Sequence, residues 1–157
     1  MAAVKILKSA GVIAYAYFVT SPVGIGKANR RDDVLLVQFF LAAISSRADT
    51  ATQESFKPPG AQPFIIDGIW GPNSQRYLNH FLATFNRGSQ KAGTKGIWAD
   101  GVVDVPPPGV FFGALHHQLY AIVVLNATYR EQFGTPAHAQ LHTNGLFPKE
   151  LTDQFYT

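Results

Sequence analysis

The chain has 157 residues, no cysteine and a formal net charge of +3 at pH 7. The absence of cysteine excludes disulfides, thiolate catalysis and cysteine-based zinc sites. Basic residues form no cluster beyond Arg30-Arg31, which argues against nucleic-acid binding. Charged residues are only 15% of the chain, against about a quarter in a typical soluble domain. This composition favours a component of an assembly over a free enzyme.

Residues 1–22 are predicted to form an N-terminal arm that ends at Ser21-Pro22. Two lysines precede an apolar run in this arm, which loosely mimics a signal peptide, but no convincing cleavage site follows. The run is also too short to span a bilayer as a helix. Its composition predicts a β-strand over residues 12–19 instead.

A first helix is predicted over about residues 30–45. Asn29 is a candidate N-cap, and Asp32 and Asp33 lie in the first turn, where the helix dipole favours negative charge. Apolar residues then recur at steps of three, four and three, at Val34, Val37, Leu41 and Ile44. This spacing is typical of an amphipathic helix.

The segment from Phe64 to Tyr77 is the most informative part of the chain. An apolar run leads into the turn Asp67-Gly68, where the Asp side chain is expected to accept hydrogen bonds from backbone N–H groups. A second tight turn at Gly71 precedes a helix predicted over residues 73–86. That helix has an apolar stripe at Leu78, Phe81, Leu82 and Phe85.

These two segments together resemble the peptidoglycan-binding-domain-like family, in the variant found in phage and secretion-associated proteins. The matching residues are Asp33, Val34, Val37, Gln38 and Leu41 in the first helix, and Asp67, Gly68, Trp70, Gly71 and Ser74 around the turn. The resemblance covers about residues 20–105. It implies a small helical domain with two pseudo-repeated halves, each containing a DG turn. Asp100-Gly101, which follows Asp67-Gly68 by 33 residues, is the candidate second turn.

The candidate ligand-binding residues lie in and after the first DG turn: Asp67, Trp70, Asn73, Arg76 and Asn79. Trp70 is either a core residue or a platform on which a sugar ring stacks. Arg76 and Asn79 either contact the carboxylate and carbonyl groups of a stem peptide or are simply solvated. No catalytic residues, cofactor or metal site are predicted, because no nucleophile, base or carboxylate pair has local motif support.

A third helix is predicted over residues 113–133, and Gly134 and Pro136 mark its end. Residues 135–157 are predicted to form an irregular tail. His138 and His142 in this tail are predicted to be exposed to solvent and not to bind a metal.

The predicted fold is mainly α. A three-helix, peptidoglycan-binding-like domain over residues 23–134 carries short β pieces, an extended N-terminal arm over residues 1–22 and an extended C-terminal tail over residues 135–157. The predicted core comprises Val34, Val37, Leu41, Leu78, Phe81, Phe85, Leu119 and Ile122.

The predicted function is a non-catalytic peptidoglycan-binding-like module in a phage virion or a similar assembly that contacts the cell envelope. The alternative is a purely structural assembly protein that uses this fold for protein–protein contacts. The predicted location is a virion or the extracytoplasmic cell envelope, and the predicted partners are peptidoglycan and other subunits, with no nucleic acid and no membrane span. Apolar residues near both ends predict packing against another subunit, with folding back onto the chain's own core as the alternative.

Overall fold

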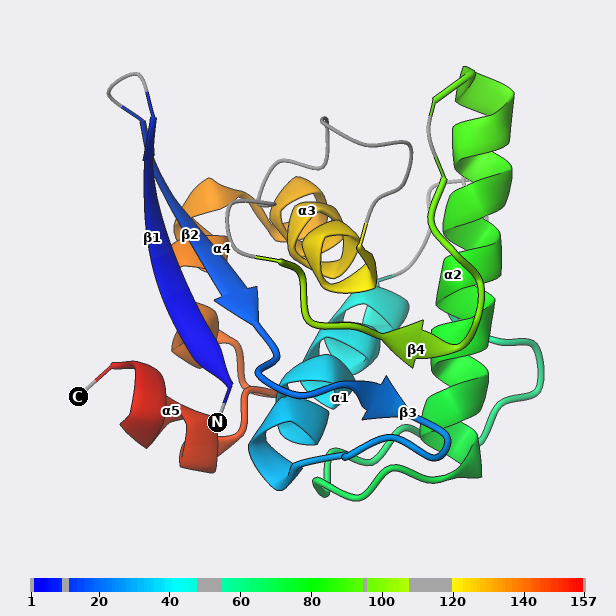
Figure 1. Cartoon of the computed structure of the whole chain (residues 1–157), viewed down its shortest axis with the longest axis horizontal. Coiled ribbons are helices and arrows are strands. Elements are labelled where there is room, and N and C mark those ends of the chain that lie inside the picture. The colour runs from blue at the N-terminus through cyan, green and yellow to red at the C-terminus, as the bar shows by residue number, and fades with distance from the viewer. Residues whose placement is uncertain (1, 10–11, 48–54, 95, 108–119, 157) are drawn as a thin grey trace.

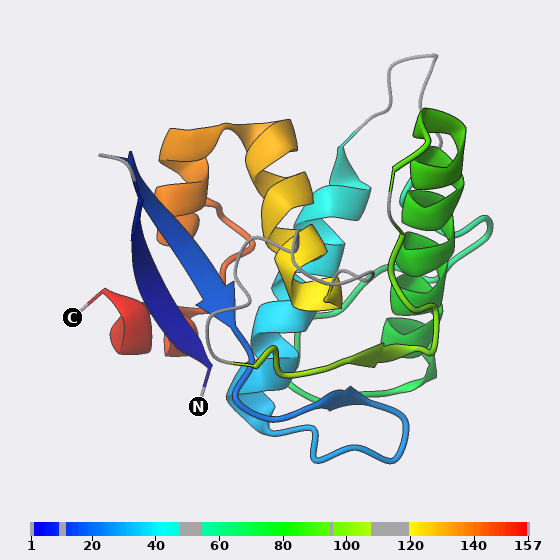
Figure 2. The ribbon, with the colours of Figure 1, turned by 45° about the horizontal axis from the view of Figure 1, so that its top comes forward.

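A computed structural model of the chain describes residues 2–9, 12–47, 55–94, 96–107 and 120–156. These ranges are mostly helical, with two small antiparallel sheets. Helix α1 (Arg31–Ser46) lies in the middle of the molecule (Figures 1 and 2). A β-hairpin lies on one side of it and helix α2 (Pro72–Ala92) on the other.

Helix α1 is buried along almost its whole length, from Asp33 to Ile44. Because other elements cover it on several sides, it is apolar on more than the single predicted stripe. Its two buried polar side chains, Asp33 and Gln38, both have hydrogen-bond partners. The Asp33 carboxylate accepts bonds from the backbone N–H groups of Thr20, at 2.8 Å, and Ser21, at 3.0 Å. These bonds fix the segment that enters the helix.

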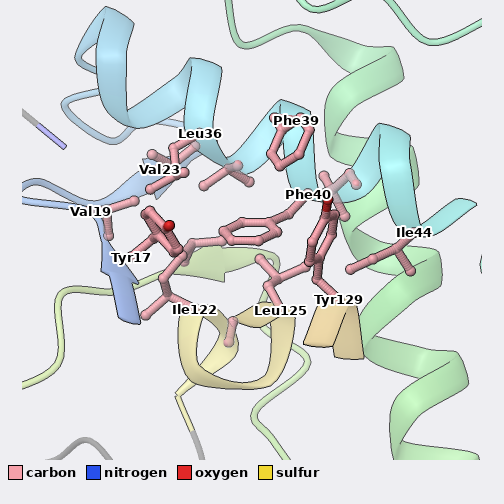
Figure 3. Close-up of a cluster of buried hydrophobic side chains, with 14 of the residues drawn as sticks. Tyr17, Val19, Val23, Leu36, Phe39, Phe40, Ile44, Ile122, Leu125 and Tyr129 are labelled. Carbon is pink, nitrogen blue, oxygen red and sulfur yellow. The ribbon is translucent and has the colours of Figure 1, made fainter. Parts of the chain in front are cut away.

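The hydrophobic core lies between α1 and helix α3 (Ala121–Phe133) and is rich in aromatic rings (Figure 3). Phe40 of α1 packs edge-on against Tyr17 and Tyr129, with ring centroids 6.5 and 5.7 Å away. The predicted core is confirmed for the residues that are fully or almost fully buried: Val34, Val37, Leu41, Leu78, Phe81 and Ile122. Phe85 is half-buried against this core, and Leu119 lies outside the described residues.

The N-terminal segment is a hairpin and not an extended arm. Strand β1 (Ala3–Ser9) pairs antiparallel with β2 (Val12–Phe18), and the latter confirms the predicted strand. Tyr17 in β2 is fully buried, and its backbone N–H and C=O both bond the side chain of Asn126 in α3, at 3.0 and 2.8 Å. The hairpin therefore packs on the core of the same chain, where the Asn126 side chain provides hydrogen-bond partners for the buried backbone groups of Tyr17.

The C-terminal segment is likewise folded, so the prediction of an irregular, extended tail is wrong. It forms α4 (Thr135–Ala139), the short 3-10 helix η1 (Leu141–Thr143) and α5 (Lys149–Phe155). Leu141 and Leu151 are fully buried. The apolar residues that suggested a subunit contact therefore pack largely on the chain's own core, although Leu146 stays 45% exposed.

The prediction for the tail histidines is half wrong. His138 is buried, with 2% of its surface exposed, and its Nε2 lies 2.9 Å from Asn126 Oδ1. The Asn126 amide already donates to Tyr17 and Ile122, so His138 must donate this bond through a protonated Nε2. Burial lowers the pKa of His138 to about 4. His142, by contrast, is exposed as predicted.

Two helix boundaries differ from their predicted positions. Helix α2 continues past Gly88 to Ala92, because a single glycine in a helix costs only about 1 kcal/mol. The helix ends at Gly93, which adopts a left-handed conformation (φ 68°). Helix α3 begins at Ala121, after an extended Tyr120, and ends at Phe133 as predicted. The rest of the predicted third helix lies outside the described residues.

A second small sheet joins the two halves of the predicted domain. Strand β3 (Val23–Gly24) pairs antiparallel with β4 (Val102–Val103). Asn29 closes the loop after β3 and does not cap α1: its side chain bonds the backbone N–H and C=O of Gly24, at 2.9 and 2.8 Å. This sheet brings the loop of residues 25–28 next to the second DG turn.

Candidate functional site

The first DG turn is built as the sequence predicts. The Asp67 carboxylate accepts a hydrogen bond from the backbone N–H of Ile69, at 2.9 Å, and Gly68 adopts a positive φ of 75°. That bond, followed by one from the Gln38 amide, holds the pKa of Asp67 below its usual range. The role of Asp67 in fixing the turn is therefore confirmed.

Gln38 in α1 makes five hydrogen bonds in and around this turn. Its Oε1 accepts from the backbone N–H groups of Asp67, at 3.1 Å, and Gly68, at 2.9 Å. Its Nε2 lies 3.0–3.1 Å from Asp67 Oδ1, Ile69 O and Ser74 Oγ. A single buried amide thus docks the turn on the central helix.

Arg31 connects the same turn to the C-terminal helix. Its guanidinium donates to the backbone carbonyl of Asp67 at 2.6 Å and forms a two-point ion pair with Glu150 of α5, at 2.7 and 3.0 Å. Gly68 packs closely against the Arg31 side chain, since a Cβ placed on Gly68 would lie 2.7 Å from Arg31 Nη1. The turn is thereby fixed from two sides.

The second DG turn has the same local geometry as the first. The Asp100 carboxylate accepts from the backbone N–H of Val102, at 3.1 Å, and Gly101 adopts a positive φ of 74°. It too is docked by a glutamine of a preceding helix, because Gln75 Nε2 in α2 donates to the carbonyl of Gly101 at 2.8 Å. The two turns therefore share the Asp–backbone bond and the positive φ of the glycine, and each is bonded by a glutamine, although Gln38 accepts from the N–H groups of its turn and Gln75 donates to a carbonyl.

The segment of residues 96–103, named here the α2 strap, runs beside α2 (Figures 1 and 2). At one end, the Asn86 side chain bonds both the N–H and the C=O of Ile97, each at 2.8 Å. At the other end, Gln75 bonds Gly101, whose Cα also packs beside Asn79. Three amide side chains on α2 thus determine the path of the strap.

Trp70 and Asn79, both predicted ligand residues, lie together at the Gln75 end of the strap. Trp70 is half-buried and its Nε1 donates to Gln75 Oε1 at 2.8 Å. Gln75 Nε2 in turn donates to Asn79 Oδ1 at 3.0 Å. Trp70 therefore fits both interpretations in part, since it packs against the core but is only half-buried.

Asn73 and Arg76 do not join this cluster. Asn73 Nδ2 donates to the carbonyl of Pro63 at 3.3 Å, and Arg76 donates to the carbonyl of Pro59 at 2.6 Å. Both side chains bind the loop that precedes the first DG turn. Asn73 and Arg76 therefore make contacts within the chain, and Asp67 belongs to the first DG turn and not to the cluster of Trp70 and Asn79.

Three large apolar side chains near the two turns are exposed. Trp98 on the strap is 64% exposed, Ile69 beside the first turn is 67% exposed, and Ile25 in the loop after β3 is 75% exposed. Gly24, which precedes Ile25, packs closely on Gly101, since a Cβ there would lie 2.8 Å from the Gly101 oxygen. The surface near the two turns therefore carries exposed apolar side chains together with the exposed amide of Asn79.

No cluster of three or more His, Asp or Glu side chains that could hold a metal ion occurs in the described ranges. None of the helices in these ranges combines the length and the apolar character that crossing a bilayer requires.

Comparison of the chain with models of protein families, with curated proteins and with solved structures finds no match.

Four residues of this surface were not among the residues predicted from the sequence: Gln75, Asn86, Trp98 and Ile25. One signal was present, because Gln75, Asn79 and Asn86 are four and seven positions apart and share a helix face. Such a stripe of amide side chains on one helix face indicates that an extended segment packs there, because its backbone N–H and C=O groups need hydrogen-bond partners. For Ile25 there was no signal, since its position depends on the pairing of β3 with β4.

Proposed function

We propose that the chain is a non-catalytic peptidoglycan-binding-like module, carried by a phage virion or a similar assembly that contacts the cell envelope. The observation that supports the proposal is the repetition of one structural unit. The turn at Asp67-Gly68 docks on Gln38 of α1, and the turn at Asp100-Gly101 docks on Gln75 of α2. The resemblance to the peptidoglycan-binding-like family implies two halves, each with a helix and a DG turn. In the proposed three-helix fold, α1 and α2 belong to these halves and α3 packs beside them.

The surface around the second turn suits a polar polymer. It combines the half-buried indole of Trp70 with the exposed amide of Asn79, and the exposed indole of Trp98 lies on the adjoining strap. Aromatic faces and neutral hydrogen-bonding groups together are a suitable chemistry for sugars and peptides alike. Peptidoglycan contains both.

The test is co-sedimentation of the full chain with purified cell-wall sacculi. We expect the chain to sediment with the sacculi, Asn79→Ala to weaken binding severalfold, and Gln154→Ala, an exposed residue of α5, to leave binding unchanged. The same incubation is expected to release no soluble muropeptides, because the proposal includes no catalytic step. Absence of sedimentation would contradict the proposed function, and release of muropeptides would contradict its non-catalytic part.

A second candidate is a purely structural assembly protein. The exposed side chains of Ile25, Ile65 and Ile69 favour it, since neighbouring proteins can cover apolar surface of this kind. The low fraction of charged residues also favours it, whereas the burial of Tyr17 and Leu151 near the two chain ends weakens the argument from apolar termini. A chain that ignores sacculi but forms defined oligomers would support this candidate.

A further inference from the structure

We infer that the α2 strap is a glycan-binding edge, on which the ring of Trp98 stacks against a sugar of an N-acetylated hexosamine strand while Asn79 and Asp100 bind its polar substituents. The inference rests on the proposed function and narrows it, because it names the glycan strand, and not the stem peptide, as the ligand of this surface.

The strap carries Trp98 on its exposed side. Ile97 is 6% exposed and its backbone is bonded on both sides by Asn86, whereas Trp98 is 64% exposed. Successive side chains of an extended segment point in opposite directions, so the anchoring of Ile97 directs Trp98 outward. An indole on an anchored backbone has only two free side-chain torsions, so ordering it on binding costs little conformational entropy. Its electron-rich face attracts the C–H groups of a sugar ring.

Two polar groups near the Gln75 end of the strap retain bonding capacity. Asn79 Oδ1 accepts from Gln75, which fixes the orientation of the amide, and Asn79 Nδ2 has no hydrogen-bond partner among the described residues. Asp100 Oδ1 accepts from Val102, and its other carboxylate oxygen has no partner in the same part of the chain. The two residues therefore offer a donor that suits an acetamido carbonyl and an acceptor that suits a hydroxyl.

Trp98 and Asp100 lie on the strap and Asn79 on α2, two segments that run side by side (Figures 1 and 2). The α2 segment from Gln75, which bonds the strap at Gly101, to Asn86, which bonds it at Ile97, spans about 16 Å. An edge of this length suits several units of a linear chain. The Asp100 carboxylate also disfavours an anionic group of a ligand at its own position.

The test is a titration of the full chain with two probes. The indole N–H signals of its two tryptophans in NMR spectra report binding. The probes are a β-1,4-linked N-acetylglucosamine pentamer and a synthetic stem pentapeptide. We expect the pentamer to shift the Trp98 indole signal, which Trp98→Phe identifies, and the stem peptide to leave it unchanged. Trp98→Ala is expected to weaken pentamer binding at least tenfold, whereas Trp98→Phe, which keeps an aromatic ring, weakens it less. Circular dichroism checks that both variants fold.

Each other outcome has a defined meaning. If sacculi bind the chain but the pentamer does not, or if Trp98→Ala binds both as the wild type does, the inference is wrong and the proposed function stands. If sacculi fail to bind while the pentamer binds through Trp98, the glycan edge stands and the proposed function fails. If the pentamer does not bind and the sedimentation coefficient differs between wild type and Trp98→Ala, Trp98 contacts another copy of the chain. That result would overturn the inference.

Discussion

Gln38 combines donor and acceptor functions that few other side chains could supply at its position. Its Oε1 accepts from two backbone N–H groups while its Nε2 approaches three oxygens, all within a buried side chain. A glutamate would lose the donor and place a second carboxylate beside Asp67. The amide is therefore required for the docked conformation of the first DG turn.

Replacement of Gln38 by alanine is expected to lower the free energy of unfolding by about 2 to 4 kcal/mol, because buried backbone groups lose their partners. Urea denaturation measures this change. Gln90→Ala, at an exposed position of helix α2, serves as the control and is expected to change the free energy of unfolding by less than about 0.5 kcal/mol. Equal effects of the two substitutions would contradict the importance of the Gln38 contacts.

His138 makes the stability of the molecule depend on acid pH. Its pKa is about 4 in the folded chain, lowered by burial, against about 6.5 in an unfolded chain. Between these values the unfolded state binds more protons, so stability falls as the pH falls from about 6.5 to about 4. The loss attributable to this one group is expected to reach about 3 kcal/mol at pH 4.

The variant His138→Gln tests this prediction, because a glutamine amide can still donate to Asn126 but does not titrate. Its unfolding free energy is expected to depend less on pH than that of the wild type over pH 4 to 6.5. His142→Gln, at the exposed histidine of the same segment, is the matched control and should keep the wild-type slope. A slope that His138→Gln leaves unchanged would show that other groups cause the acid sensitivity.

At the scale of elements, the pairing of β3 with β4 depends on Gly24. Its φ of +155° is rarely adopted by other residues, and a Cβ would lie 2.8 Å from the backbone oxygen of Gly101. Because backbone atoms of a docked turn cannot move aside cheaply, the contact excludes even a methyl group. The close approach of two glycines thus joins the loop after β3 to the second DG turn.

Gly24→Ala is expected to destabilise the fold by about 2 kcal/mol or more, through backbone strain and separation of the two strands. Gly88→Ala should have the opposite sign: Gly88 lies within α2, nothing lies within 4 Å of its Cβ position, and alanine is favoured over glycine in a helix by about 1 kcal/mol. Thermal unfolding of both variants measures the difference. A stable Gly24→Ala protein would refute the proposed close packing.

The regular elements could be predicted where local pattern and tertiary environment agree. The stripe from Val34 to Ile44 and the turn at Asp67 are local, so the sequence specified them. The tail was misjudged because α4 and α5 are too short to carry a clear periodicity, and their stability comes from packing against α1 and α3. His138 was placed in solvent for the same reason. Its burial depends on Asn126 and Tyr17, which are distant in the sequence.

At the scale of the whole molecule, the two terminal segments are joined by side-chain contacts. The hydroxyls of Tyr17 in β2 and Tyr156 after α5 lie 2.6 Å apart, and the Tyr156 oxygen also accepts from the backbone N–H of Leu141 at 3.0 Å. Burial raises the pKa of both tyrosines, so the pair stays neutral at physiological pH. Contacts between residues so far apart in sequence require the complete fold.

A double-mutant cycle with Tyr17→Phe and Tyr156→Phe is expected to show a coupling energy of about 1 kcal/mol, because each single variant removes the same hydrogen bond. Tyr156→Phe alone should cost more than the coupling energy, since Leu141 also loses its acceptor. Chemical denaturation of the four proteins gives these values. Strict additivity would show that the two hydroxyls contribute independently.

The hairpin and α5 lie at one end of the long axis of the molecule, and α2 with its strap lies at the other (Figure 1). A tether attached beside the hairpin or α5 would therefore leave the α2 strap at the opposite end of the long axis from the point of attachment. A module oriented in this way can scan a surface in front of it while a linker limits its distance, so attachment raises the effective concentration of the edge without covering it.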